Sequence, residues 1–246
     1  MPEESTPVAM KDNSKFLIPG AIVLAAVVIG GALYMGLSQR GGTDTPPAPK
    51  AVNIKDVKID GNPYIGKKDA PATLVYWSDH QCPFCKAFEI GGVEGITNPA
   101  VMPDLIKKYV DTGKLKIVFK DYPFLGEDSM TAAEYEHAIW ELYPAQFYAW
   151  RVAVLEEQDE EGDQGFGDAA SIDQIIAQKF PQMDGAKIRQ ALVANKAKYD
   201  TAIDADREEG SKFGVKGTPG FITGTSLIPG FYPLEAFVEA IDPQLK

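Results

Sequence analysis

The distribution of apolar residues divides the chain into a short N-terminal region and one larger domain. Residues 16–37 form an apolar run without a single charged side chain. As a helix, this run would span roughly 30 Å, about the thickness of the hydrocarbon core of a bilayer. It is longer than the apolar core of a secretory signal (about 7–15 residues), and its end makes a poor cleavage site. The run is therefore predicted to be an uncleaved transmembrane anchor.

Basic residues near the ends of the run indicate its orientation. Lys11 and Lys15 precede it and Arg40 follows it, which slightly favours a cytoplasmic N-terminus. Residues 41–49 are rich in Gly, Thr and Pro, as in a flexible linker. The predicted order is a cytoplasmic tail (1–15), an anchor in the lipid bilayer (16–37), a linker (38–51) and an extracytoplasmic domain (52–246).

From about residue 52 onward, the pattern alternates between strands and helices. Residues 73–78 and 115–120 are short apolar runs of β-formers, typical of buried strands. Cys82-Pro83 is expected to open a helix, because Pro fits the first helical turn. A mostly helical block follows at about 127–210, then two short strands at 220–223 and 226–228 and a terminal helix at 233–241. This order predicts one α/β domain that carries a helical insertion.

Charge and cysteine content exclude some classes of function but say little about the fold. The net charge is −11 and no basic stripe is present, which argues against nucleic acid as a partner. Only two cysteines occur, Cys82 and Cys85, and a bridge between them would close too short a loop to stabilise the fold. The pair is therefore better explained by thiol chemistry, which suits a domain outside the cytoplasm.

The spacing of the two cysteines suggests a role for each. A thiol attacks a disulfide only as a thiolate, and the N-terminus of a helix favours a negative sulfur at Cys82. Cys85 lies one turn further on and is expected to be more buried, as the internal partner. A zinc site made of both cysteines with His80 and His137 is formally possible, but this spacing is unlike that of known zinc sites. No metal and no cofactor other than the redox-active pair is expected.

Four segments together resemble the DsbA-like family of thioredoxin-fold oxidoreductases, over about residue 52 to the C-terminus. They are Asp69-Ala70-Pro71, Trp77-Ser78-Asp79, Gln81-Cys82-Pro83-Phe84-Cys85-Lys86 and Val215-Lys216-Gly217-Thr218-Pro219-Gly220-Phe221. The resemblance implies a thioredoxin-like fold in which Thr218-Pro219 forms a cis-peptide loop facing the cysteines. Thr218 would then offer backbone groups to an incoming peptide.

Two positions depart from the family pattern. Many relatives carry an acidic residue six positions before the first cysteine, where it accepts a proton from the second thiol, but this chain has Tyr76. Water, Tyr76 or another group must replace that acid, although Tyr76 is more often a packed strand residue. Phe84 stands where the most oxidising relatives place His, so Cys82 should be less acidic and the disulfide less strongly oxidising. His80 and Pro83 are further candidates for tuning the thiolate, although His80 is otherwise expected to be a partly exposed loop residue.

Two other clusters have ordinary explanations. The acidic run 156–163 does not match a calcium loop and is expected to be a solvated loop. Tyr143, Phe147, Tyr148 and Trp150 are expected mainly to form the core of the helical block.

The sequence thus predicts a membrane-anchored protein thiol–disulfide oxidoreductase that donates disulfides to unfolded or reduced extracytoplasmic proteins. By the family resemblance, a membrane redox partner would reoxidise the pair. Two alternatives stay open: a disulfide reductase or isomerase fed by a reducing membrane partner, or a chaperone-like module that binds peptides beside Pro219.

Overall fold

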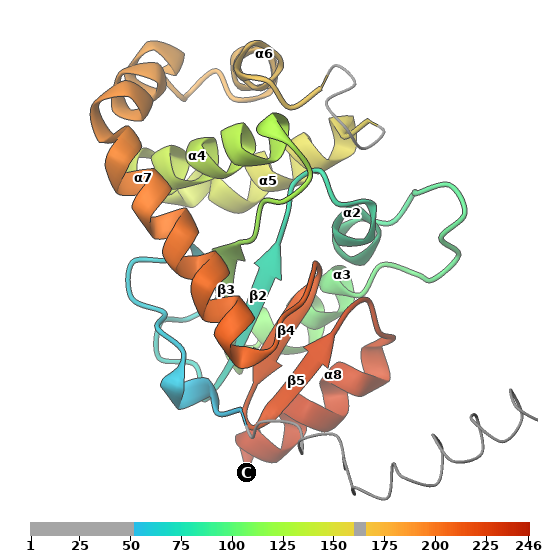
Figure 1. Cartoon of the computed structure of the whole chain (residues 1–246). Helices are drawn as coiled ribbons and strands as arrows, with labels where there is room; N and C mark the ends of the chain where they lie inside the picture. Colours follow the sequence, from blue (N-terminus) through green and yellow to red (C-terminus); the bar gives the residue numbers. More distant parts are fainter. Residues whose placement is uncertain (1–51, 160–165) are drawn as a thin grey trace, which may run out of the picture. The chain divides into compact units, whose positions relative to one another are not determined.

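The computed structural model describes residues 52–159 and 166–246 (Figure 1). The predicted tail, anchor and linker all fall outside this part of the chain, as do residues 160–163 of the acidic run. Among the residues described, no helix is both long enough and apolar enough to cross a membrane.

A five-stranded mixed sheet forms the centre of the domain, in the order β1-β3-β2-β4-β5. The two central strands, β2 and β3, are parallel, and the other pairs of neighbours are antiparallel. The strands are β1 (Tyr64–Ile65), β2 (Ala72–Ser78), β3 (Leu115–Asp121), β4 (Gly220–Thr223) and β5 (Ser226–Pro229). All four predicted strands are confirmed, whereas β1 is too short to leave a pattern in the sequence.

The sheet is covered on both faces, which explains why residues 74–77 of β2 are all apolar or aromatic rather than alternating with polar residues. Side chains on one face of β2, including Tyr76, pack in a cluster with Phe88, Phe221 and Phe237. Those on the other face, including Trp77, pack with Val118 and Ile222. Each of these residues is at most 1% exposed.

The helices confirm one α/β domain with a helical insertion. Three short helices belong to the part of the domain around the sheet. Between β2 and β3 come α2 (Pro83–Glu89) and α3 (Met102–Leu105), which is continued by a π-helical turn (Ile106–Val110), and α8 (Leu234–Ile241) follows β5. The insertion consists of α4 (Glu127–Leu142), α5 (Phe147–Glu157), α6 (Ala169–Lys179) and α7 (Gly185–Phe213). Figure 1 shows α4, α5 and α6 grouped beyond the end of β2, while α7 runs from this group back alongside the sheet to β4.

The helical insertion has a core of its own, built around buried Trp150 and Tyr135. The expectation for the aromatic residues of α5 is only partly right. Phe147 and Tyr148 pack instead with the sheet cluster that contains both cysteines. The insertion and the sheet therefore meet directly behind the cysteine pair.

Candidate active site

The two cysteines lie where β2 ends and α2 begins. Cys82 is the N-cap of α2, Pro83 occupies the first turn, and the Cys85 amide donates to the Cys82 carbonyl at 3.0 Å. The Asp79 carboxylate fixes the preceding loop, because it accepts hydrogen bonds from the backbone N–H groups of Gln81 and Phe124, both at 2.9 Å. Both cysteines are free thiols, 3% and 0% exposed. The predicted helix start at Cys82-Pro83 is confirmed.

The environments of the two sulfurs shift their pKa values in opposite directions. A hydrogen bond from the Cys85 thiol is the largest cause of a lowered Cys82 pKa, and the backbone amides of the first turn of α2 add to it. Burial raises the pKa of Cys85 well above its ordinary value. Cys82 is therefore the sulfur that loses its proton more readily, whereas Cys85 holds its proton more tightly.

The loop before β4 lies against Cys82. The peptide bond between Thr218 and Pro219 is cis, as the family resemblance implied, and the Cys82 sulfur donates a hydrogen bond to the Thr218 carbonyl at 3.4 Å. Pairing of β4 with β2, with Gly220 opposite Trp77, brings this loop to the cysteines. The strand order thus joins two motifs that are far apart in the sequence.

A shallow cavity of about 320 Å³ opens beside this loop. Its walls include Phe84, Ile96, Thr218, Pro219 and Phe231. Phe84 is 51% exposed and lies two residues after Cys82. The cavity offers apolar contacts within reach of Cys82, which suits an unfolded peptide.

Tyr76 occupies the position that is acidic in many relatives, and it is packed in the core as expected. Its buried hydroxyl donates a hydrogen bond to Glu89 Oε1 at 3.0 Å. Burial is the largest influence on the pKa of Cys85 and raises it, whereas Tyr76 acts to lower it. Glu89 lies on α2 and is 1% exposed. Sequence reasoning missed this acid, although its place four residues after Cys85 puts both on one face of a helix.

Glu89 belongs to a buried charge network that the sequence analysis did not find. Arg151 of α5, 0% exposed, donates from Nε to both Glu89 oxygens at 3.0 Å and from Nη2 to Oε1 at 2.7 Å. The same guanidinium reaches Glu136 of α4 at 2.5 Å and the Ser78 hydroxyl at 2.7 Å. Although burial acts to raise it, Arg151 and His80 bring the pKa of Glu136 down to about 2.

The expectation that His80 is a partly exposed loop residue is wrong. It is 2% exposed, because α4 and α5 cover the loop, and its Nε2 lies 2.6 Å from Glu136 Oε2. Its link to the cysteines runs through Gln158, whose amide donates to the carbonyls of His80 at 2.7 Å and of Cys82 at 3.1 Å. His80 therefore faces the charge network with its ring and the active-site loop with its backbone.

The candidate zinc ligands are not brought together. In residues 52–159 and 166–246, the one set of three potential metal ligands with suitably close atoms is His80, Asp121 and Glu136, which includes neither cysteine. His137 lies 3.1 Å from Asp121. Because Arg151 already neutralises Glu136, we interpret this set as part of the ion-pair network.

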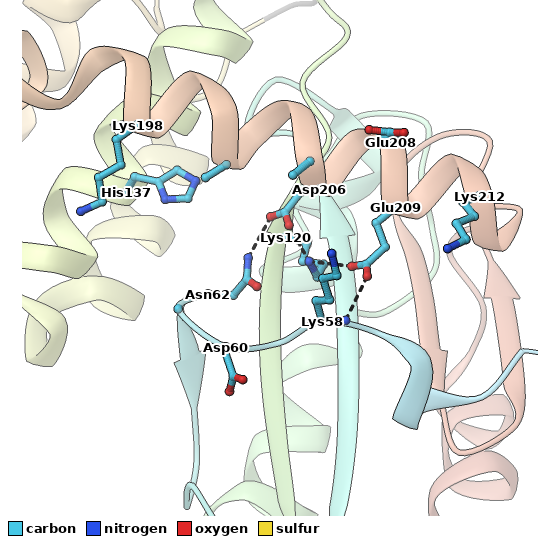
Figure 2. A pocket seen from close by; sticks show the side chains of 13 residues that line it. Lys58, Asp60, Asn62, Lys120, His137, Lys198, Asp206, Glu208, Glu209 and Lys212 are labelled. Carbon is cyan, nitrogen blue, oxygen red and sulfur yellow. Dashed lines mark hydrogen bonds and ion pairs between the residues drawn. The ribbon is translucent and has the colours of Figure 1, made fainter.

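A larger cavity, of about 470 Å³, lies between α7, β3 and residues 58–62 and contains neither cysteine (Figure 2). Buried Lys120 pairs there with Asp206 and Glu209, and the Asn62 amide donates to Asp206 at 2.9 Å. Burial raises the pKa of Asp206 to about 6. The buried charged side chains of this cavity thus pair with one another.

Comparison with known proteins decides the family. The family model described as "Thioredoxin" matches residues 58–243. The chain belongs to this family. A probable disulfide bond formation protein D from Bacillus anthracis is 26% identical, over 96% of this chain and 100% of that protein.

Two solved structures are similar in fold. Oxidised BdbD from Bacillus subtilis has a TM-score of 0.65 and 24% identity, and covers 79% of this chain and 98% of its own. The thiol-disulfide exchange protein alpha-DsbA2 from Wolbachia pipientis has a TM-score of 0.61 and 26% identity, covering 74% and 86%. The predicted thioredoxin-like fold with a helical insertion is confirmed. So is the predicted enzyme class, a DsbA-like protein thiol–disulfide oxidoreductase that forms disulfide bonds.

Proposed function

We propose that this chain introduces disulfides into reduced extracytoplasmic proteins through the Cys82–Cys85 pair. The observation that carries the proposal is the contrast between the two sulfurs. Cys82 has a lowered pKa and lies beside the Thr218-Pro219 loop, whereas Cys85 is completely buried and has a raised pKa. This is the asymmetry that a disulfide donor needs, since one sulfur meets the substrate and the other leaves.

The reaction follows from this geometry. In the oxidised protein, a substrate thiolate attacks Cys82 Sγ, the Cys82–Cys85 bond breaks, and its electron pair goes to Cys85. A second substrate thiolate then attacks the substrate sulfur of the mixed disulfide, and Cys82 leaves as a thiolate. The substrate gains one disulfide and the enzyme is left with the two thiols described above.

The substrate site in this proposal is the 320 Å³ cavity beside Cys82. Half-exposed Phe84 and the ring of Phe231 give apolar contacts to an unfolded segment, and Thr218 offers backbone groups to the peptide. These contacts do not depend on a particular substrate sequence, as suits an enzyme with many protein substrates.

The proposal includes the predicted setting of the enzyme. Residues 1–15 lie in the cytoplasm, residues 16–37 cross the bilayer and residues 38–51 link the anchor to an extracytoplasmic domain beginning at about residue 52. Reduced Cys82 and Cys85 must pass two electrons onward before another turnover. The chain requires a redox partner for this step, and we propose one in the same membrane.

The reduction potential of the Cys82–Cys85 pair tests the direction of electron flow. We expect the purified chain, equilibrated with glutathione buffers, to have a potential well above −270 mV but below about −120 mV, because Phe84 provides no cation beside the thiolate. A value near or below −270 mV would favour a reductase or isomerase instead.

Substrate oxidation by the double variant Cys82→Ser/Cys85→Ser tests the alternative of a peptide-binding module. We expect this variant to leave the thiols of a reduced protein substrate unoxidised while it still binds an unfolded peptide. Turnover by the wild-type chain, followed as loss of substrate thiols, is the reference. Equal turnover by both proteins would exclude the cysteines as the reacting groups.

A further inference from the structure

The backbone of Cys82 determines where its sulfur lies. Cys82 is the N-cap of α2, with φ −78° and ψ 119°, and its sulfur meets the Thr218 carbonyl at 3.4 Å. Its N–H donates to the Asp79 carbonyl at 3.1 Å, and its own carbonyl accepts from the N–H groups of Cys85 and Lys86 at 3.0 and 3.1 Å. A change in ψ at Cys82 would therefore move the sulfur relative to the N–H groups that begin α2.

A side chain of the helical insertion holds the Cys82 carbonyl. Gln158 is the C-cap residue of α5 and is 9% exposed. Its amide nitrogen donates to the carbonyl of Cys82 at 3.1 Å and to that of His80 at 2.7 Å. An amide NH₂ group carries two hydrogens, which provides one for each carbonyl. Gln158 thus bridges the two carbonyls on either side of Gln81.

Gln158 is itself held by α2. Lys86 Nζ donates to the backbone carbonyl of Gln158 at 3.2 Å and to that of Glu156 at 3.4 Å. A cation in this place binds carbonyls at the end of a helix that have no partner within the helix. Because Lys86 follows Cys85 directly, α2 binds the residue that in turn binds Cys82. These contacts form a closed ring, which fixes the distance between the end of α5 and the start of α2.

We propose, given the reacting pair proposed above, that Gln158 is a positioning residue for Cys82. By holding the carbonyls of His80 and Cys82, its amide keeps the reactive sulfur beside the Thr218 carbonyl and close to the N–H groups of the first turn of α2. Gln158 acts through the backbone and takes no part in bond making or proton transfer. It favours the thiolate of Cys82, which is the form that leaves when a substrate disulfide is released.

Gln158→Met tests the proposal, because it removes both donors and keeps a side chain of similar length. On the reduced, purified full chain, the pKa of Cys82 is measured from its rate of alkylation by iodoacetamide across pH. We expect this pKa to rise by about 0.5 to 1 unit, the usual size of one lost hydrogen bond. The equilibrium with glutathione should shift about 3- to 10-fold toward the Cys82–Cys85 disulfide, since a less stable thiolate makes the pair less oxidising.

Gln244→Met is the matched control. The amide nitrogen of Gln244 also donates to two acceptors, the Thr223 hydroxyl at 2.8 Å and the Ala240 carbonyl at 2.9 Å. Thr223 pairs with Leu74 near the start of β2, whereas the cysteines follow the end of that strand. This variant loses the same kind of bridge, so its stability should fall, but the pKa of the reactive cysteine and the glutathione equilibrium should equal those of the wild type.

Each outcome bears on a separate claim. A wild-type Cys82 pKa and glutathione equilibrium in Gln158→Met would overturn the positioning role, even if the variant were less stable. Where Met does not fit and the variant fails to fold, Gln158→Ala removes the same donors, needs no extra space and is judged by the same two measurements. Failure of the wild-type chain to form a mixed disulfide between Cys82 and glutathione would instead overturn the proposed reacting pair.

Discussion

Replacement of Arg151 by Met should destabilise the protein more than any ordinary surface change. Arg151 is 0% exposed and is shared by Glu89 and Glu136, which are 1% and 0% exposed. Met fills much of the space left by the side chain but provides no charge and no hydrogen-bond donor. The two carboxylates would then have to become protonated within the core or move out to water.

Two estimates give the same magnitude. Breaking a buried ion pair by removing one partner costs about 3–5 kcal/mol. Independently, burial alone would raise the pKa of Glu136, yet Arg151 and His80 hold it at about 2, below the ordinary 4.5. At 1.36 kcal/mol per pH unit, this difference corresponds to about 3 kcal/mol. The free energy of unfolding of Arg151→Met at pH 7 should therefore be lower by about 3 kcal/mol or more.

The pH dependence gives a sharper test than the loss alone. Because its folded-state pKa is depressed, Glu136 stabilises the wild type above pH 4.5 and loses this effect as pH falls toward about 2. The free energies of unfolding of the wild type and Arg151→Met, measured with urea under reducing conditions, should therefore converge as pH falls over this range. The control is Arg189→Met, whose side chain is 55% exposed and pairs with Asp173. It should cost at most about 1 kcal/mol. A similarly small loss in Arg151→Met at pH 7 would refute the reasoning.

Two further substitutions test the electrostatics at the two cavities. Phe84→His should lower the pKa of Cys82 and raise the reduction potential, because an imidazolium favours the thiolate. The pKa is measured from the absorbance of the thiolate across pH. An unchanged Cys82 pKa would count against a role for position 84. Asp206→Asn should flatten a fall in stability between about pH 4 and 6. Burial raises the folded pKa of Asp206 from 3.8 to about 6, so the wild type loses stability as pH rises through this window. If the free energy of unfolding, measured with urea, fell equally with pH in the wild type and in Asp206→Asn, this assignment would be contradicted.

The parts of the fold that the sequence predicts well are those whose signal is local. The apolar run 73–78 marks a strand buried on both faces, and Pro83 after Cys82 marks the first turn of a helix. The cis Thr218-Pro219 bond came from the family resemblance. Its place beside Cys82 depends on the pairing of β4 with β2, which local patterns do not contain.

The charge network could not be predicted, for a physical reason. Arg151 and Glu89 are separated by 62 positions and lie on different helices. Charged residues are almost never fully buried, so reading them as surface residues is the better guess at any one position. His80 was misjudged in the same way, because its burial depends on α4 and α5. Only the packing of the insertion against α2 shows that these charges compensate one another.

This packing gives the helical insertion a role beyond covering the sheet. Arg151 on α5 and Glu136 on α4 come from the insertion, whereas Tyr76 and Glu89 come from the strand and helix that flank the cysteines. Tyr76 occupies the position on β2 that is acidic in many relatives. The acid instead comes from α2, where its burial is tolerable only because the insertion provides the opposite charge. The buried acid of α2 and the stability of the junction between insertion and sheet therefore depend on the same guanidinium.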